Sequence, residues 1–79
     1  MKAKDLIAGN WYKFFTDDKR EYHIKSEGNN KCSKHLDNNK KLNGTGVLDT
    51  SKDYTPSLPE EINKFLPEEE QIKNNFEIY

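Results

Sequence analysis

The sequence predicts a mainly β domain, a small and strongly twisted sheet or barrel of about four or five strands with one short C-terminal helix. Two segments alternate between apolar and polar residues on either side of polar turns, which is typical of β-hairpins. Near the C-terminus, apolar residues recur instead with the period of a helix, and prolines bound that run. The 79 residues allow one domain, and nine aromatic side chains compensate for a hydrophobic fraction of only 32%.

The first hairpin is predicted from residues 11–26. Residues 11–16 are rich in aromatic side chains, residues 17–20 are polar, and Glu21–Ser26 alternates with period two. A four-residue loop would place Phe15 opposite Tyr22, whereas a three-residue loop would pair Phe14 with Tyr22 and Tyr12 with Ile24. Since a one-residue slip exchanges the two faces, the sequence leaves open which of Trp11 and Tyr12 is buried.

A second hairpin is predicted around the polar turn at residues 37–40. Leu36 and Leu42 share a face only if the loop has an odd number of residues. This favours a three-residue loop with Asn39 or Lys40 in the left-handed conformation. Residues 44–46 then bend the chain, and residues 47–48 are expected to form a further short strand.

The helix is predicted to begin at Ser57 and to end before Pro67. Ser57 would be its N-cap, Glu60 would complete a capping box, and Pro59 is tolerated in the first turn. One apolar stripe at helical spacing would pack against the sheet and consists of Leu58, Ile62, Phe65 and Leu66.

The expected organisation is a single small domain over residues 1–67, followed by an acidic tail at residues 68–79. Glu68–Glu70 would face solvent. The aromatic end of the tail, residues 75–79, is either a closing strand or mobile.

Cysteine content and the N-terminus point to a cytoplasmic protein. Cys32 is the only cysteine, so no intramolecular disulfide can form, whereas a secreted domain of this size usually has several. Residues 1–7 contain no apolar stretch of signal-peptide length, and no segment is apolar enough to span a bilayer. We therefore expect no membrane association.

Charge is distributed unevenly although the net charge is −1. Residues 1–48 contain ten Lys and Arg against six Asp and Glu, and residues 49–79 contain three against eight. The simpler interpretation is a solvated surface with two poles. The alternative is a basic half that meets an anionic partner while the acidic tail covers it or competes for it.

Catalytic and metal sites are not supported by the residue patterns. Cys32 and His35 have the spacing of metal ligands, but a structural zinc site needs about four, and only His23 and Asp37 lie near enough to contribute. As nucleophile and base the pair fails as well, because residues three apart point to opposite faces of an unbent strand. We expect no catalytic residue, no metal ligand and no cofactor.

Binding is better supported. Aromatic rings and cations are interleaved over the first hairpin, a combination that suits protein hot spots and stacking on nucleobases. One hairpin cannot bury both of its faces, so part of this set should remain at the surface. The predicted contact residues are Trp11, Tyr12, Lys13, His23 and Lys25.

The Trp11–Phe14 strand, the lysine-containing second strand and the segment Glu61–Pro67 resemble the small SH3-like proteins of bacteriophages, over about residues 5–67. That resemblance implies a small barrel with the aromatic strand first and the Leu-Pro helix packed at one end. Most members have no assigned activity. Several small phage proteins act against host immunity, by blocking a defence protein or by sequestering its nucleotide signal. The Lys/Asn-rich middle and the continuation beyond Pro67 depart from the family pattern.

Three functions follow as hypotheses, all located in the cytoplasm of the host cell. The first is a non-enzymatic phage-type accessory protein that binds and inhibits a host defence protein through the aromatic–basic sheet face or the acidic tail. The second is a binder that captures a nucleotide-type small molecule. The third is a nucleic-acid-binding module, which the overall charge disfavours. A thin core and exposed sheet edges also make a homodimer plausible.

Overall fold

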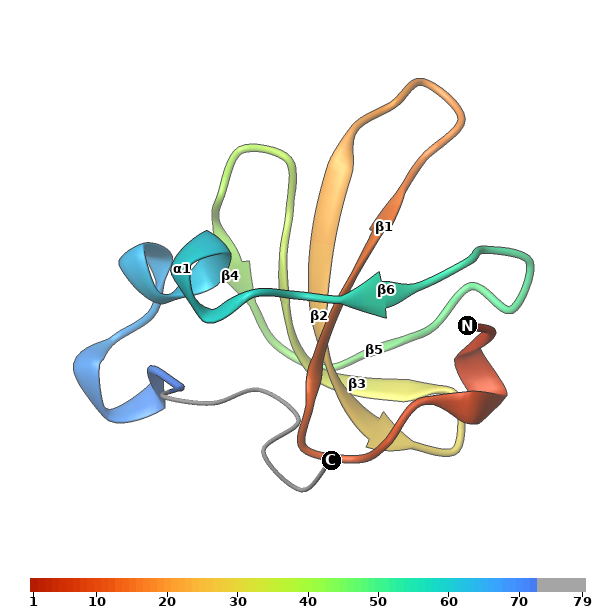
Figure 1. The fold of residues 1–79 in the computed structure, drawn as a ribbon, viewed down its shortest axis with the longest axis horizontal. Helices are drawn as coiled ribbons and strands as arrows, with labels where there is room; N and C mark the ends of the chain where they lie inside the picture. The colour runs from red at the N-terminus through yellow and green to blue at the C-terminus, as the bar shows by residue number, and fades with distance from the viewer. Residues whose placement is uncertain (73–79) are drawn as a thin grey trace.

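The computed structural model describes residues 1–72 and shows an open, twisted antiparallel sheet (Figure 1). The strand order is β4-β3-β2-β1-β6, and β5 pairs with β3 beside β4. The strands are β1 (Trp11–Phe15), β2 (Glu21–Gly28), β3 (Lys31–Leu36), β4 (Leu42–Asn43), β5 (Gly46–Val47) and β6 (Thr55–Pro56). The predicted mainly β class is confirmed, in the form of a twisted sheet rather than a closed barrel.

Helical structure is limited to short turns at the two ends of the described chain. The α-helix α1 (Pro59–Ile62) continues directly into a 3-10 turn, η2 (Asn63–Phe65). Two further 3-10 turns are η1 (Ala3–Asp5) and η3 (Glu68–Glu70). No helix in residues 1–72 has the length and apolar character needed to cross a membrane.

The β1–β2 hairpin adopts the register of the three-residue loop. Phe14 lies opposite Tyr22 and Tyr12 opposite Ile24. The turn closes with a 3.0 Å hydrogen bond from the Thr16 N–H to the carbonyl of Arg20, and Lys19 adopts a φ of 65°. A left-handed residue at the end of a three-residue loop matches the right-handed twist of the strands, which selects this register.

The other two turns of the sheet also depend on residues with positive φ. Asn29 and Asn30 have φ values of 54° and 61° and join β2 to β3 in a two-residue turn, a conformation that Asn adopts more readily than most residues. In the predicted second hairpin, Leu36 lies opposite Leu42 and Lys40 has a φ of 64°. The predicted three-residue loop is therefore confirmed, with Lys40 rather than Asn39 as its left-handed residue.

A β-bulge in β3 changes which side chains share a face. Lys25 pairs with Lys34 while the next residue, Ser26, pairs with Cys32, so Ser33 is the extra residue. Leu36 and Cys32 consequently belong to different hydrophobic clusters despite their even spacing. The expectation that Cys32 and His35 lie on opposite faces is wrong because it assumed an unbent strand.

Hydrophobic clusters cover both faces of the sheet. One contains Tyr12 and Ile24 together with Tyr54 and the N-terminal Ala3 and Leu6. The other contains Trp11 and Leu36 and is covered by side chains from the C-terminal turns, namely Ile62, Leu66, Phe65 and Ile72. Trp11 and Tyr12 are exposed by only 1% and 0%, so both rings are buried, on opposite faces.

The helix begins one residue later than predicted. Its N-cap is Leu58, and the Glu61 carboxylate accepts a 2.8 Å hydrogen bond from the Leu58 N–H. The predicted cap, Ser57, is buried and directs its hydroxyl to a histidine on the sheet. Leu58, predicted to pack, is 53% exposed, whereas Ile62 is buried as expected.

Packing continues beyond Pro67 into the segment predicted to be a tail. Ile72 contacts the cluster around Trp11. Its backbone N–H donates to the Asn63 side-chain oxygen, and its carbonyl accepts from the Asn63 side-chain amide. Glu70 forms an ion pair with Lys34 on β3, whereas Glu68 and Glu69 are exposed as expected. The predicted closing strand at residues 75–79 lies outside the described residues.

Candidate functional site

The five predicted contact residues do not form an exposed surface. Trp11 and Tyr12 are buried, and His23 is exposed by only 1%. Lys13 and Lys25 are half-buried. Four of them share one sheet face, because Trp11 lies opposite Lys25 and Lys13 lies opposite His23 on the neighbouring strand. Tyr12 faces the other side of the sheet. The C-terminal turns cover the face that these four side chains share.

His23 is the centre of a polar network beneath α1. Its Nδ1 lies 2.7 Å from the Ser57 Oγ, and its Nε2 lies 2.7 Å from a Glu21 carboxylate oxygen. A carboxylate can only accept, so the ring proton is on Nε2 and the Ser57 hydroxyl donates to Nδ1. Burial lowers the pKa of His23, which favours this neutral ring.

Two glutamates and two lysines complete the network. The Lys13 ammonium donates to Glu61 at 2.8 Å, and the Lys40 ammonium lies 3.6 Å from Glu21. The hydrogen bond from His23 lowers the pKa of Glu21. Burial alone would raise the pKa of Glu61, but Lys13 and the Leu58 N–H outweigh it, so its pKa is lowered as well. Both carboxylates are therefore ionised and balanced by one ammonium each.

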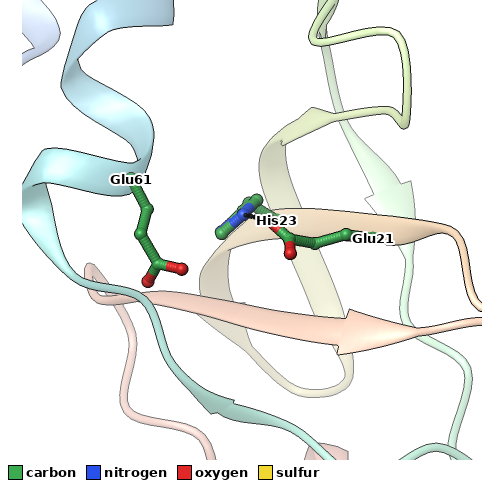
Figure 2. A group of neighbouring side chains, drawn as sticks. All are labelled: Glu21, His23 and Glu61. Carbon is green, nitrogen blue, oxygen red and sulfur yellow. Dashed lines mark hydrogen bonds and ion pairs between the residues drawn. The ribbon is translucent and has the colours of Figure 1, made fainter.

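Within residues 1–72, Glu21, His23 and Glu61 are also the group that could hold a metal ion. Figure 2 shows the Glu61 side chain directed from α1 toward His23 and Glu21 on β2, and one ligand atom of each lies within 4.8 Å of the others. A cation entering here would have to displace the ammonium groups of Lys13 and Lys40. The charge balance indicates a structural network that fastens α1 to the sheet.

The serine–histidine–glutamate chain has the order of a hydrolytic relay, but its serine is inaccessible. Ser57 is exposed by 1%, so a substrate cannot reach its hydroxyl in this arrangement. The sequence pattern could have revealed part of the network, because Glu21 and His23 are two apart on a strand and must share a face. Ser57 and Glu61 could not be joined to them without knowing where α1 packs.

An open groove lies on the opposite sheet face, where the β1–β2 hairpin extends past the segment that follows β5. Its volume is about 300 Å³. The Phe14 and Tyr22 rings stack at 5.4 Å, and Phe14 also contacts the Tyr54 ring at 5.2 Å. The other apolar side chains along the groove include Ile24, Val47 and Leu48.

Val47 is the most exposed of these apolar side chains. It is 81% accessible, although it lies in β5 beside the buried Leu48. Leu48 is held by a 2.8 Å hydrogen bond from its N–H to the Asn30 carbonyl, which fixes Val47 at the wall of the groove. No local sequence pattern indicates this site, because Phe14, Tyr22 and Val47 come together only when β5 packs beside the β1–β2 hairpin.

Cys32 and His35 line the same groove but have little reactive character. The Cys32 thiol is buried, and burial raises its pKa, so it stays protonated at neutral pH. The His35 ring donates from Nδ1 to the Gly44 carbonyl at 3.0 Å. This groove therefore offers apolar contact more readily than nucleophilic chemistry.

Comparisons of the chain with models of known protein families, with curated proteins and with solved structures found no match.

Proposed function

We propose that this protein is a non-enzymatic, phage-type accessory protein that binds a host defence protein and inhibits it, and that the groove beside Val47 receives an apolar side chain of this partner. The observation that carries the proposal is the exposed Val47, fixed at the wall of an aromatic groove on the sheet face opposite the C-terminal turns. The phage-type assignment rests on the resemblance of the Trp11–Phe14 and Glu61–Pro67 segments to the small SH3-like proteins of bacteriophages.

The shape of the groove favours a protein partner. A volume of about 300 Å³ is at the lower limit for small-molecule sites, and it is open along one side. Protein interfaces typically use a few buried anchor side chains surrounded by contacts that contribute little energy. A single apolar anchor would occupy part of the groove, while Val47 would extend the contact beyond it.

Capture of a nucleotide is the second candidate, supported by the stacked rings of Phe14 and Tyr22, which could hold a base. The polar groups of the groove do not favour a phosphate. The Lys52 ammonium, which could bind a phosphate, is paired with Asp17 at 3.0 Å, and the Asp49 carboxylate is close by in the same groove. These acids also weigh against a nucleic-acid partner.

Two substitutions of exposed apolar residues test the proposal. A partner would be isolated from bacterial extract, identified and purified, and its dissociation constant measured by calorimetry. Val47→Asp should weaken binding by about tenfold or more, because it puts a charge where the apolar anchor is desolvated. Leu58→Asp is the matched control, because Leu58 is also exposed but lies outside the groove, and it should leave the affinity unchanged.

Circular dichroism would establish that both variants remain folded. Equal binding by wild type and Val47→Asp would refute the groove as the contact site. A protein that carries a bound nucleotide in native mass spectrometry, and no partner protein, would replace the first candidate with the second.

A further inference from the structure

Asp49 lines the groove, and a second carboxylate, that of Asp17, is joined to the groove residue Lys52. Asp17, in the turn after β1, has a fully exposed side chain, and Asp49 is exposed in the segment after β5. Hydrogen bonds from the Ser51 hydroxyl and N–H, at 2.6 and 2.8 Å, lower the pKa of Asp49 and keep it ionised. The two carboxylates approach the groove from separate segments of the chain.

Lys52 balances only part of this charge. Its ammonium is 3.0 Å from Asp17, and its side chain is 20% exposed. Lys52 thereby joins the segment after β5 to the turn of the β1–β2 hairpin, across the mouth of the groove. Because Asp17 holds the Lys52 ammonium, Asp49 has no ion-pair partner among the described residues, and its carboxylate beside an apolar surface attracts a cation and repels a phosphate.

The position of these charges relative to the apolar surface restricts what can bind. A group that enters between Tyr22 and Val47 must be apolar, whereas a neighbouring group can reach Asp49, which lines the same groove. A lysine or arginine side chain carries its charge at the end of an apolar stem, so it can cover part of this surface while its charged end reaches Asp49.

Resting on the function proposed above, we infer that the partner presents an apolar anchor side chain with a lysine or arginine beside it, and that Asp49, left without an ion pair while Asp17 holds Lys52, selects for that basic residue. Charge complementarity of this kind affects specificity and association rate more than total affinity. The expected gain is therefore modest, about three- to tenfold in affinity over an acidic neighbour.

The inference can be tested with defined peptides before any partner is known. The probes are N-acetyl-phenylalanyl-arginine amide and N-acetyl-phenylalanyl-glutamate amide, titrated into isotopically labelled protein and followed by NMR. The arginine probe should shift the backbone signals of Tyr22, Ile24 and Val47 and should bind about three- to tenfold more tightly than the glutamate probe. Asp49→Asn should reduce this preference, and Asp53→Asn, an exposed acid that pairs with Lys2 outside the groove, should not.

The outcomes separate this inference from the function proposed above. Equal shifts by the two peptides would overturn the selection for a basic neighbour while leaving the groove as an apolar docking site. Tighter binding of the glutamate probe would reverse the inferred charge preference. If neither peptide shifts the groove signals, the inference fails, and the Val47→Asp comparison with the intact partner decides separately whether the groove is used.

Discussion

His23 shows how burial changes the chemistry of one residue. From the sequence it is predicted to be a contact residue at the surface of the first hairpin, whereas the structure buries it as a neutral ring between Ser57 and Glu21. Its interactions join β2 to the segment that leads into α1. The residue therefore contributes to stability, and it does so only while it remains unprotonated.

This dependence predicts that stability falls as the pH drops below about 6.5. Burial lowers the pKa of His23 beneath its value of 6.5 in an unfolded chain, so the unfolded state takes up the proton first. The free energy of unfolding should then decrease by at most about 1.4 kcal/mol per pH unit. Urea titrations between about pH 5 and 7 would measure this slope, above the range in which carboxylates become protonated.

His23→Gln should remove the slope, even though the variant is less stable at every pH. His35→Gln, which changes the only other histidine, should retain it. Below about pH 4.5 a second loss of stability is expected, because the pKa values of Glu21 and Glu61 are lowered in the folded state. An unchanged slope in His23→Gln would show that other groups cause the pH dependence.

At the scale of elements, turns decide which face each strand presents. The β1–β2 turn puts Lys19 in the left-handed region, at a φ of 65°, and this closure sets Phe14 opposite Tyr22. The groove and the His23 network both depend on that register, because a one-residue slip would exchange them across the sheet. The bulge at Ser33 likewise places Cys32 and His35 on the groove face.

Lys19→Gly should stabilise the protein by about 1 kcal/mol, because glycine adopts the left-handed conformation without the steric cost that a side chain incurs. The midpoint of urea denaturation would report the change. Lys41→Gly provides a control, because Lys41 is also exposed but has no positive φ, and it should be neutral or destabilising. A destabilised Lys19→Gly variant would mean that the Lys19 side chain contributes more than its backbone strain costs.

At the scale of the whole molecule, the C-terminal turns complete the fold. Residues 59–72 cover Trp11 and Leu36, and the ion pair of Glu70 with Lys34 joins the acidic part of the sequence to the basic sheet. The charge asymmetry seen in the sequence is therefore partly satisfied within the chain. The sheet edges are short as well, since Pro56 lies in β6 and the opposite edge is divided into β4 and β5, which limits pairing between copies.

Deletion of residues 68–79 should therefore destabilise the protein and expose Trp11. Removing the contacts of Ile72 and Glu70 should lower the free energy of unfolding by roughly 2 kcal/mol, given the apolar area that Ile72 buries. Trp11 is the only tryptophan, so its fluorescence should shift to longer wavelength. The control is deletion of residues 73–79, which retains both contacts. A truncation at Pro67 that leaves emission and stability unchanged would contradict this role.

Much of the fold could be predicted because it depends on local patterns. The alternation of apolar and polar residues in Glu21–Ser26 predicts a strand. The need for Leu36 and Leu42 to share a face predicts a loop with an odd number of residues in the second hairpin. The contact residues were harder to place. Trp11, Tyr12 and His23 have the composition of a binding face, but the sequence does not show that a second layer covers them.

The amino-acid sequence by itself determined the mainly β class, the two hairpins and the start of the C-terminal helix to within one residue. These features follow from periodicity and turn chemistry, which act over a few residues. Only the tertiary structure decided that both Trp11 and Tyr12 are buried, that Ser57 binds His23, and that Phe14, Tyr22 and Val47 border one groove. Each of these depends on which segments pack together across the sheet, and contacts between distant residues have no local pattern to reveal them.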